Sequence, residues 1–398
     1  MEQQLQKLFW DSTPNRAYDW LGIEPTPEEL EAVLSPDNSN LPLNRIIVSP
    51  DNEGNMRTLQ RFVHTAFKRE NHSCRGCNFG IFAQSGQGKT YIVKCFAETV
   101  KLPLVFVQSS VLADSWMLWQ LICEAGQKAG TPIVPCKNGT ADYMLPPMII
   151  FFDEAHAIPR KMMRGGLLNA MEPDDGLLQI RQPGVKGNSF MVNCQKVCWV
   201  AATTEKGLLF DAFANRLGTY LEWAPANQDE AAKIVKMNID KRHENGEFPF
   251  SMPLEVCSLV ARYQKVPREA IAFAVKVIQQ RDMKSDTWES ACEIVAHDIG
   301  LDQWGFNEKQ TAILTALGQR PIAESRLAVV AKCRIEQVQR YELPPLMAYD
   351  NGGPLVVTVS GKGMAITAAG LKELDKRGIT HKGHRVTAEY FEMKRAES

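Results

Sequence analysis

A glycine-rich loop constrains the fold more than any other feature of the sequence. Residues 78–83 (NFGIFA) form an apolar run that predicts a buried strand, and the segment that ends at Val100 has the apolar periodicity of a helix. The loop between them reads QSGQGK. Its glycines let the backbone approach an anion closely, and the start of the following helix adds the positive end of its dipole. The order of strand, glycine loop and helix therefore predicts a phosphate-binding loop in an α/β fold.

The side chains of this loop indicate a nucleotide and a metal ion. Lys89 is expected to reach the β- and γ-phosphates, and the hydroxyl of Thr90 is expected to hold Mg²⁺. We therefore predict ATP and Mg²⁺ as cofactors. The residues expected to contact the nucleotide here are Ser85, Gly86, Gln87, Gly88, Lys89, Thr90 and Tyr91.

Two carboxylates follow the next uninterrupted apolar run. Residues 148–152 (MIIFF) predict a strand buried on both faces of a parallel sheet, and Asp153 and Glu154 come directly after it. In an open α/β sheet, this carboxyl edge also carries the phosphate loop. Asp153 can therefore support Mg²⁺ through water, and Glu154 can polarise the attacking water.

The four residues from Asp153 to His156 (DEAH) also occur in helicases that have two tandem motor domains. Such proteins need a second motor half, and no segment after residue 225 resembles a second nucleotide-binding sheet. We therefore interpret His156 as a residue at a helix start and not as a catalytic one.

A third apolar run, residues 197–202 (VCWVAA), predicts another buried strand, which ends in Thr203 and Thr204. A polar residue at this strand end would lie between the two carboxylates and the γ-phosphate. Further along the chain, Gly-Leu-Leu stands at residues 207–209 and Asn-Arg-Leu-Gly at residues 215–218.

In their order and spacing these motifs resemble the RuvB family of AAA+ ATPases, and the resemblance covers roughly residues 45–375. It implies that Thr203 is the sensor of the γ-phosphate. It also implies that Arg216 is an arginine finger, which enters the ATP site of the neighbouring subunit. A planar guanidinium delivered in this way stabilises charge on the transferring phosphoryl group, so that hydrolysis depends on assembly.

Residues 226–303 carry helical periodicity, as expected for the helical lid of this class. Within them Pro267 marks a helix start, and Arg268 lies in the first turn, where the helix dipole favours acidic residues. An arginine in this position is expected to face an anion. The resemblance makes Arg268 the second sensor, which touches the nucleotide of its own subunit, and Pro225 is a further predicted nucleotide contact.

The C-terminal part predicts a winged helix. From Phe306 the apolar pattern indicates three helices, and residues 354–359 and 364–367 then predict two strands around a glycine turn, followed by a helix. Modules of this kind bind either DNA or proteins, and the resemblance favours DNA.

Lys362, at the tip of the predicted wing, is expected to contact the phosphate backbone, with Arg334 and Arg340 as weaker candidates. The family places two basic residues around the wing glycine. This chain keeps only Lys362 there, which leaves the strength or geometry of the DNA contact open.

The predicted fold class is α/β, with an AAA+ parallel-sheet domain, a helical lid and a winged helix. The predicted ranges are 1–44 for an N-terminal extension, 45–225 for the nucleotide-binding domain, 226–303 for the lid, 304–378 for the winged helix and 379–398 for a C-terminal tail.

Four further features concern single segments. Residues 26–34 predict a helix with a capping box, and residues 126–147 form a long insertion that we interpret as a loop directed at the ring pore or at a partner. Residues 176–197 predict a hairpin, and the resemblance implies that a DNA-binding partner protein docks on it. Trp116 and Trp119 are expected to face the core.

Composition limits where DNA can bind. The chain of 398 residues has a formal net charge of −1 and a pI of about 6.7, so any contact with DNA must be local. No apolar run approaches the roughly 20 residues that span a bilayer, and the first ten residues lack a secretion signal, so the expected location is cytoplasmic, without a membrane. The ten cysteines suggest reduced thiols, and Cys74 and Cys77 read as a loop before a strand in preference to a metal site.

Together these features predict an ATP-hydrolysing ring, with six subunits expected, that moves double-stranded or branched DNA. Two alternatives remain. One is an AAA+ switch that binds DNA or protein in its ATP state and recruits another enzyme, and the other is a protein-remodelling ATPase whose winged helix docks partners.

Overall fold

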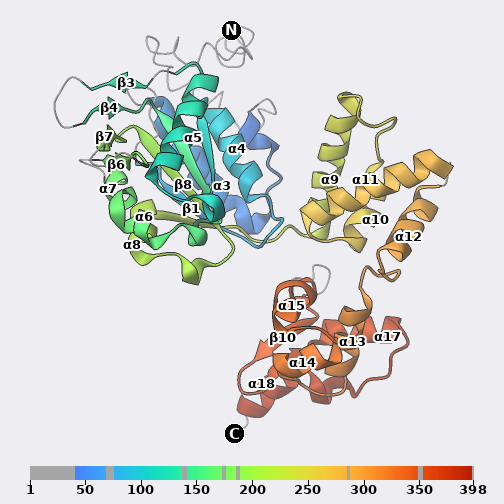
Figure 1. The fold of residues 1–398 in the computed structure, drawn as a ribbon. Coiled ribbons are helices and arrows are strands. Elements are labelled where there is room, and N and C mark those ends of the chain that lie inside the picture. Colours follow the sequence, from blue (N-terminus) through green and yellow to red (C-terminus); the bar gives the residue numbers. More distant parts are fainter. Residues whose placement is uncertain are drawn as a thin grey trace. The chain divides into compact units, whose positions relative to one another are not determined.

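The computed structural model describes residues 41–68, 76–131, 133–136, 141–172, 176–184, 189–284, 287–347 and 353–396 (Figure 1). The helix predicted at residues 26–34, the Cys74 thiol and Lys186 of the predicted hairpin lie outside these residues. The chain divides into two compact units, Met1–Ala224 and Pro225–Ser398.

A sheet of five parallel strands organises the first unit. Its order is β2 (Leu104–Gln108), β5 (Met148–Asp153), β8 (Val197–Thr203), β1 (Phe79–Phe82) and β9 (Thr219–Glu222). The apolar runs at residues 78–83, 148–152 and 197–202 are therefore strands, as predicted. β9 was not predicted, because its sequence, TYLE, mixes polar and apolar residues at the sheet edge.

Helices cover both faces of this sheet, so the side chains of the central strands alternate between two cores. Ile149 and Phe151 of β5 lie in one core, and Ile150 and Phe152 lie in the other. The first core also contains side chains of α3 (Glu53–Lys68) and α4 (Lys89–Val100), and the second contains those of α5 (Ser115–Lys128) and α8 (Asp211–Leu217). Burial on both faces explains why the strand sequences read as unbroken apolar runs.

The first core includes the segment around η2 (Pro42–Arg45), which precedes α3. Leu41 and Leu43 are fully buried in it, and the amide of Leu43 donates to the Thr99 hydroxyl (2.9 Å). The boundary predicted between residues 44 and 45 therefore falls inside a segment whose side chains share one core.

A buried asparagine fixes the end of the first unit. Asn52, at the end of η3 (Pro50–Asn52), accepts from the Ala224 amide (2.9 Å) and donates to the Ala224 carbonyl (3.1 Å). It also donates to the Ser49 hydroxyl (2.9 Å). The Asn52 side chain thus satisfies both backbone groups of Ala224, as a neighbouring strand would, and fixes the backbone just before Pro225.

The predicted hairpin forms β6 (Leu177–Arg181) and β7 (Ser189–Asn193), and the insertion before it adds β3 (Val134–Pro135) and β4 (Tyr143–Met144). These strands form a small sheet in the order β3-β4-β7-β6. Trp116 and Trp119 of α5 pack against its aromatic side chains and against the second core, as predicted. Short helices complete this unit: η4 (Ser109–Val111), η5 (Ala155–Ala157), α6 (Arg160–Met162), η6 (Met163–Leu167), α7 (Leu168–Ala170) and η7 (Lys206–Leu208).

The second unit begins with four helices that share one core: α9 (Gln228–Glu244), α10 (Leu254–Tyr263), α11 (Pro267–Lys284) and α12 (Trp288–Asp298). The helical periodicity predicted for this region is confirmed. Asn227 and Glu230 form a reciprocal capping box that begins α9.

A winged helix follows, as predicted. Its elements are α13 (Glu308–Leu317), α14 (Glu324–Val330), α15 (Ile335–Gln337), η8 (Val338–Glu342), α16 (Leu343–Met347), β10 (Val356–Val359), β11 (Gly363–Ile366) and α17 (Ala368–Lys376). The antiparallel strands β10 and β11 form the wing. The predicted C-terminal tail contains η9 (Gly383–Val386) and α18 (Ala388–Ala396), which the sequence did not reveal.

The connection between the four helices and the winged helix is packed closely. A Cβ added at Gly305 would lie 2.6 Å from the Arg262 carbonyl oxygen at the end of α10, and Gly305 has a φ of +83°. Only glycine suits this backbone, because both the approach and the left-handed conformation exclude a side chain.

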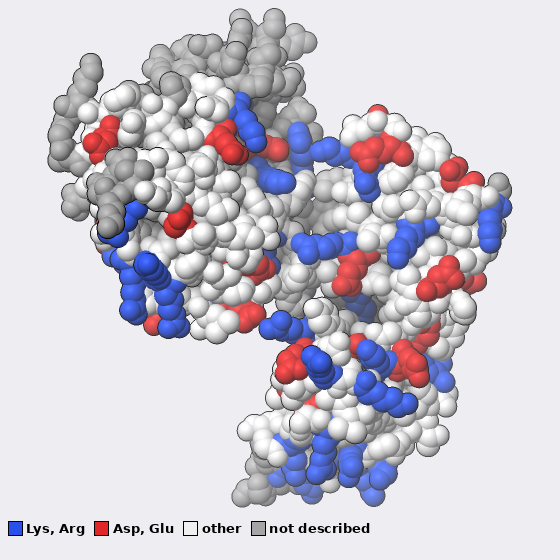
Figure 2. Space-filling view, in the orientation of Figure 1, with Lys and Arg blue, Asp and Glu red and all other residues white. Residues whose placement is uncertain are grey.

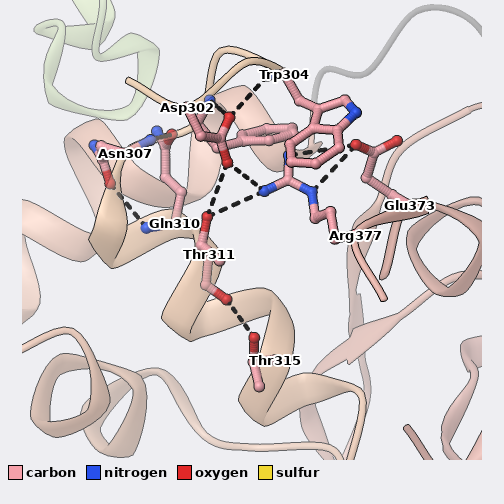
Figure 3. A network of polar contacts seen from close by, with 9 residues as sticks. Asp302, Trp304, Asn307, Gln310, Thr311, Thr315, Glu373 and Arg377 are labelled. Carbon is pink, nitrogen blue, oxygen red and sulfur yellow. Dashed lines mark hydrogen bonds and ion pairs between the residues drawn. The ribbon is translucent and has the colours of Figure 1, made fainter. Parts of the chain in front are cut away.

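A buried arginine joins this connection to α17 (Figure 3). The Arg377 guanidinium lies over the rings of Trp304 and Phe306 and pairs with the carboxylates of Asp302 (2.6 Å) and Glu373 (3.3 Å). The side chains of Arg377 and Glu373 are only 3% and 4% exposed. Asp302 in turn accepts from the amides of Trp304 and Phe306, so one network fixes the turn that enters α13.

We predict that Arg377→Ala loosens the winged helix, because it leaves a buried carboxylate without its main partner, at a cost of about 3 kcal/mol. Hydrogen–deuterium exchange of α13 and α17 amides should become about 100-fold faster. Lys376→Ala is the control, since exposed Lys376 contacts the same Glu373. Equal exchange in the two variants would contradict this role of the network.

Candidate nucleotide-binding site

The glycine loop leads from the end of β1 directly into α4. Gly86 and Gly88 both have a φ of +81°, and Gly88 is the N-cap of α4. A Cβ at Gly88 would meet no atom within 4 Å, so the left-handed backbone, and not crowding, requires glycine there. The loop thus turns so that the amides at the start of α4 can face an anion.

Lys89 lies back over this loop. Its side chain is 7% exposed, and its ammonium group donates to the carbonyls of Ala83 (3.0 Å) and Gln84 (3.3 Å). The same nitrogen is 4.0 Å from a carboxylate oxygen of Glu154. The predicted loop lysine and the predicted base are therefore brought together.

The other predicted loop contacts lie in the same short stretch. Thr90 and Tyr91 are in the first turn of α4, directly after Gly88 and Lys89. Burial raises the pKa of the Tyr91 phenol, although the side chain is 42% exposed. Asp153 ends β5, which places its carboxylate at the carboxyl edge where β1 leads into the loop. An acid and a hydroxyl at this edge suit Mg²⁺, which takes few protein ligands and keeps phosphate and water oxygens.

Glu154 adopts an unusual backbone conformation directly after β5. Its φ of 51° and ψ of 54° are left-handed, which costs a residue with a side chain about 1 kcal/mol or more. Its carboxylate accepts from both the amide (3.4 Å) and the hydroxyl (3.2 Å) of Thr204. The strand ends of β5 and β8 thus hold this carboxylate at the edge that carries the loop.

The two threonines at the end of β8 point to different partners. Thr203 is 1% exposed, its hydroxyl lies 2.7 Å from Nδ1 of His156, and it accepts from the Glu205 amide (3.1 Å). Thr204 is exposed and contacts Glu154. The Thr203 hydroxyl is therefore enclosed, whereas Thr204 lies at the surface beside Glu154. The γ-phosphate contact of Thr203 remains a prediction, and we propose Thr204 as the alternative.

His156 was interpreted as a helix-start residue, and it does lie in η5 just after Glu154. It does more than begin the helix, because its Nδ1 lies 3.4 Å from the Glu154 carboxylate as well as close to the Thr203 hydroxyl. Spacing alone could not show this, since the two segments meet only through the pairing of β5 with β8.

Arg216 is at the opposite edge of the sheet from the loop. It lies near the end of α8, and its carbonyl accepts from the side chain of Asn78 (3.4 Å), the residue before β1. The loop begins beyond the other end of β1, roughly 16 Å along the strand. Arg216 is therefore placed away from the phosphate loop of its own chain.

The guanidinium of Arg216 is held by its own unit. It forms an ion pair with Glu172 and donates to the Ala212 carbonyl (3.1 Å), and its side chain is 27% exposed. Its Nε is buried and has no hydrogen-bond partner among the described residues. Glu172 was not singled out in the sequence, because it lies 44 residues away and no local motif marks it.

The remaining predicted site residues belong to the second unit. Pro225 begins this unit, and Arg268 is exposed in the first turn of α11. Burial raises the pKa of the adjacent Glu269, and Arg268 acts in the opposite direction. The roles predicted for Pro225 and Arg268 at the nucleotide remain predictions.

The candidate DNA contacts are exposed residues of the winged helix. Lys362 lies in the turn between β10 and β11, Arg334 precedes α15, and Arg340 lies in η8. Lys362 also lies 5.6 Å from the ring centroid of Phe391 in α18.

The sequence predicts no metal site at Cys74 and Cys77 and no membrane-spanning segment, and the structure bears on both points only within the described ranges. There, no group of three His, Cys, Asp or Glu residues could hold a metal ion, and Cys77 is buried. In the same ranges no helix has the length and apolar character needed to cross a bilayer.

Comparison with known proteins defines the class of this site. Residues 80–223 match the model of the AAA family, the ATPase family associated with various cellular activities. This range begins in β1, contains the glycine loop and both carboxylates, and ends just after β9. Residues 80–223 therefore have the fold of an AAA domain.

Most of the chain resembles solved structures of RuvB from Thermotoga maritima. The RuvB Holliday junction branch migration motor matches with a TM-score of 0.55 and 17% sequence identity, over 82% of this chain and 95% of that chain. A single-substitution mutant of that RuvB matches with a TM-score of 0.57 and 17% identity, over 81% and 94%. No curated protein matches the sequence. The predicted AAA+ fold of the RuvB type is confirmed.

We predict that Thr204→Val slows ATP turnover by about 100-fold and leaves stability unchanged, because it removes a polar contact of Glu154 at the protein surface. Thr203→Val should instead lower stability by about 1–3 kcal/mol, because it removes a buried partner of His156. Steady-state ATPase rates and thermal unfolding of both variants measure this. If Thr203→Val instead stopped ATP turnover without a loss of stability, and Thr204→Val changed neither turnover nor stability, Thr203 would be the γ-phosphate contact.

Proposed function

We propose that this chain is an ATP-hydrolysing DNA motor that works as a ring, with six subunits expected. The observation that carries this proposal is the separation of Arg216 from its own glycine loop across the sheet. A cationic residue placed there can complete a nucleotide site only in another copy of the chain. The RuvB-like fold supports the same arrangement.

The chemistry at each site follows from the side chains at the carboxyl edge. Lys89 and the amides of the loop would bind the β- and γ-phosphates, and Thr90 and Asp153 would hold Mg²⁺, which would neutralise phosphate charge. Glu154, oriented by Thr204, polarises the water that attacks the γ-phosphorus. His156 holds the buried Thr203 and stands beside Glu154, so it acts as a positioning residue.

The neighbouring subunit supplies the remaining charge. In each chain the Arg216 guanidinium is paired with Glu172, so approach to a neighbour's γ-phosphate exchanges a carboxylate for a phosphate partner. An arginine finger of this kind accelerates phosphoryl transfer by about 10³–10⁵-fold. Hydrolysis then occurs only at an assembled interface, which lets one subunit report its nucleotide state to the next.

The second unit supports the assignment to DNA. Arg268 at the start of α11 and Pro225 are both proposed to contact the nucleotide of their own subunit. The winged helix carries exposed basic residues, of which Lys362 lies at the wing tip. Contacts with phosphates give affinity that depends on salt and not on base sequence, as a motor on duplex or branched DNA requires.

An AAA+ switch is the second candidate, because the same shared site could signal a bound state without movement. Strand displacement or branch migration driven by ATP separates the two functions. A switch would bind DNA in ATP but displace nothing, and a protein-remodelling ATPase would hydrolyse ATP at a rate that DNA does not change.

We predict that Glu154→Gln binds ATP with nearly unchanged affinity but hydrolyses it at least 100-fold more slowly, because the magnesium ligands stay and the water loses its polarising carboxylate. Nucleotide titration and phosphate-release assays measure the two effects. Asp153→Asn is the comparison, since it should weaken Mg²⁺-dependent binding as well. A Glu154→Gln variant with the wild-type rate would show that another group activates the water.

Mixing two inactive variants tests the shared site. Arg216→Ala keeps the glycine loop and Lys89→Ala keeps the finger, so neither should hydrolyse ATP alone. An equal mixture should recover up to about a quarter of the wild-type rate, because half of the subunits keep the loop and half of their neighbours keep the finger. No recovery in rings shown to contain both variants would argue against action between subunits.

A further inference from the structure

Residues 379–396, called the C-terminal extension below, pack onto the wing. Thr387 pairs with Ile366 of β11, and Ala388 of α18 shares a small core with Val359 and Ala365 of the wing strands. Phe391 of α18 packs against the same core. The wing hairpin is therefore backed by a helix and is not a free two-stranded arm, which by itself is marginally stable.

The path of the extension between α17 and α18 is also fixed. The Lys382 amide donates to the Gly318 carbonyl (2.9 Å), and the Gln319 side chain donates to the Thr380 carbonyl (2.8 Å), so the segment lies against the end of α13. Thr387 then caps α18 through its hydroxyl, which accepts from the Tyr390 amide (3.3 Å). The extension is therefore a built part of the winged helix.

One contact links this extension to the wing tip. The ammonium group of Lys362 lies 5.6 Å from the centroid of the Phe391 ring, a cation–π distance. Lys362 is the one basic residue that the turn at residues 360–362 retains. Phe391 therefore restricts where that ammonium group can lie, and Lys362 itself is exposed.

The extension brings positive charge of its own. Lys382, Arg385 and Lys394 are exposed, and residues 379–396 contain four Lys or Arg against two Glu, in a chain whose formal net charge is −1. Figure 2 shows several Lys and Arg side chains gathered at the end of the second unit, where Figure 1 places α18. A local basic surface therefore exists on a protein that has no overall attraction for polyanions.

We propose that the wing and the C-terminal extension form one composite surface that binds the sugar-phosphate backbone of duplex DNA. Lys362 contacts one phosphate from a position set by Phe391, and Lys382, Arg385 and Lys394 contact further phosphates. The extension thus supplies the charge that a wing with a single basic residue lacks. This inference rests on the proposed DNA motor and assigns the part of it that touches the duplex.

A charge-reversal experiment on the full chain tests the surface. Lys382→Glu, Arg385→Glu and Lys394→Glu are combined in one variant, and the control combines Lys233→Glu, Lys241→Glu and Lys276→Glu, exposed residues of α9 and α11 with the same change in charge. Binding to a labelled duplex is measured between 50 and 200 mM salt, on the order of the range in which phosphate contacts are lost.

The test variant should bind at least tenfold more weakly than the control at low salt, and its dependence of log K on log salt should be shallower by about 2–3. Equal binding by the test and control variants would overturn the surface but not the motor. A wild-type chain that binds no duplex would overturn the motor itself. Polyglutamate serves as a model of an acidic protein. If the test variant lost binding to polyglutamate but still bound the duplex as the control does, the partner would be an acidic protein and the proposal would be overturned.

A double-mutant cycle tests the positioning of Lys362. Phe391→Leu keeps an apolar side chain against the wing and removes the ring, so it should weaken duplex binding by about two- to fivefold. In a Lys362→Ala background the same change should have no effect. An equal effect in both backgrounds would show that Phe391 acts only by holding α18, and the positioning role would fall.

Discussion

The geometry of one parallel strand underlies the account of this protein. β1 leads at its carboxyl end into the glycine loop, and at its amino end Asn78 binds the carbonyl of Arg216. The strand is buried among four others and cannot bend to bring these ends together. The glycine loop and the backbone of Arg216 are thus fixed at opposite ends of one strand. Two such sheets, one from each of two chains, can place a loop and a guanidinium on a single nucleotide.

Around the loop, the pairing of β5 with β8 determines which polar groups meet. Glu154 is held in a left-handed conformation at one strand end, and Thr204 at the other strand end binds its carboxylate. Beneath them His156 contacts the enclosed hydroxyl of Thr203. Because Glu154 contacts both Thr204 and His156, these contacts connect the exposed end of β8 to the buried Thr203 hydroxyl.

Much of this arrangement could be predicted from the sequence, because the strongest signals are local. The loop, the unbroken apolar strands and the switch from helical to strand period in the winged helix each depend on neighbouring residues. The different surroundings of Thr203 and Thr204 could not be predicted, because both residues stand at the end of a strand buried on two faces and either side chain could point outward. Glu172 and Phe391 could not be identified from the sequence either, because each contacts a residue far away in the chain. The helix α18 was not predicted because its apolar side packs only on a small hairpin, which requires few apolar residues and gives a weak helical periodicity.

The dependence of ATP hydrolysis on protein concentration tests the shared site most directly. The rate per subunit should rise steeply as subunits assemble and should fall toward zero on dilution below the assembly range, with added duplex DNA shifting the rise to lower concentration. A rate per subunit that stays constant down to concentrations at which only single chains are present would contradict the account, because each chain would then complete its own site without Arg216 of a neighbour.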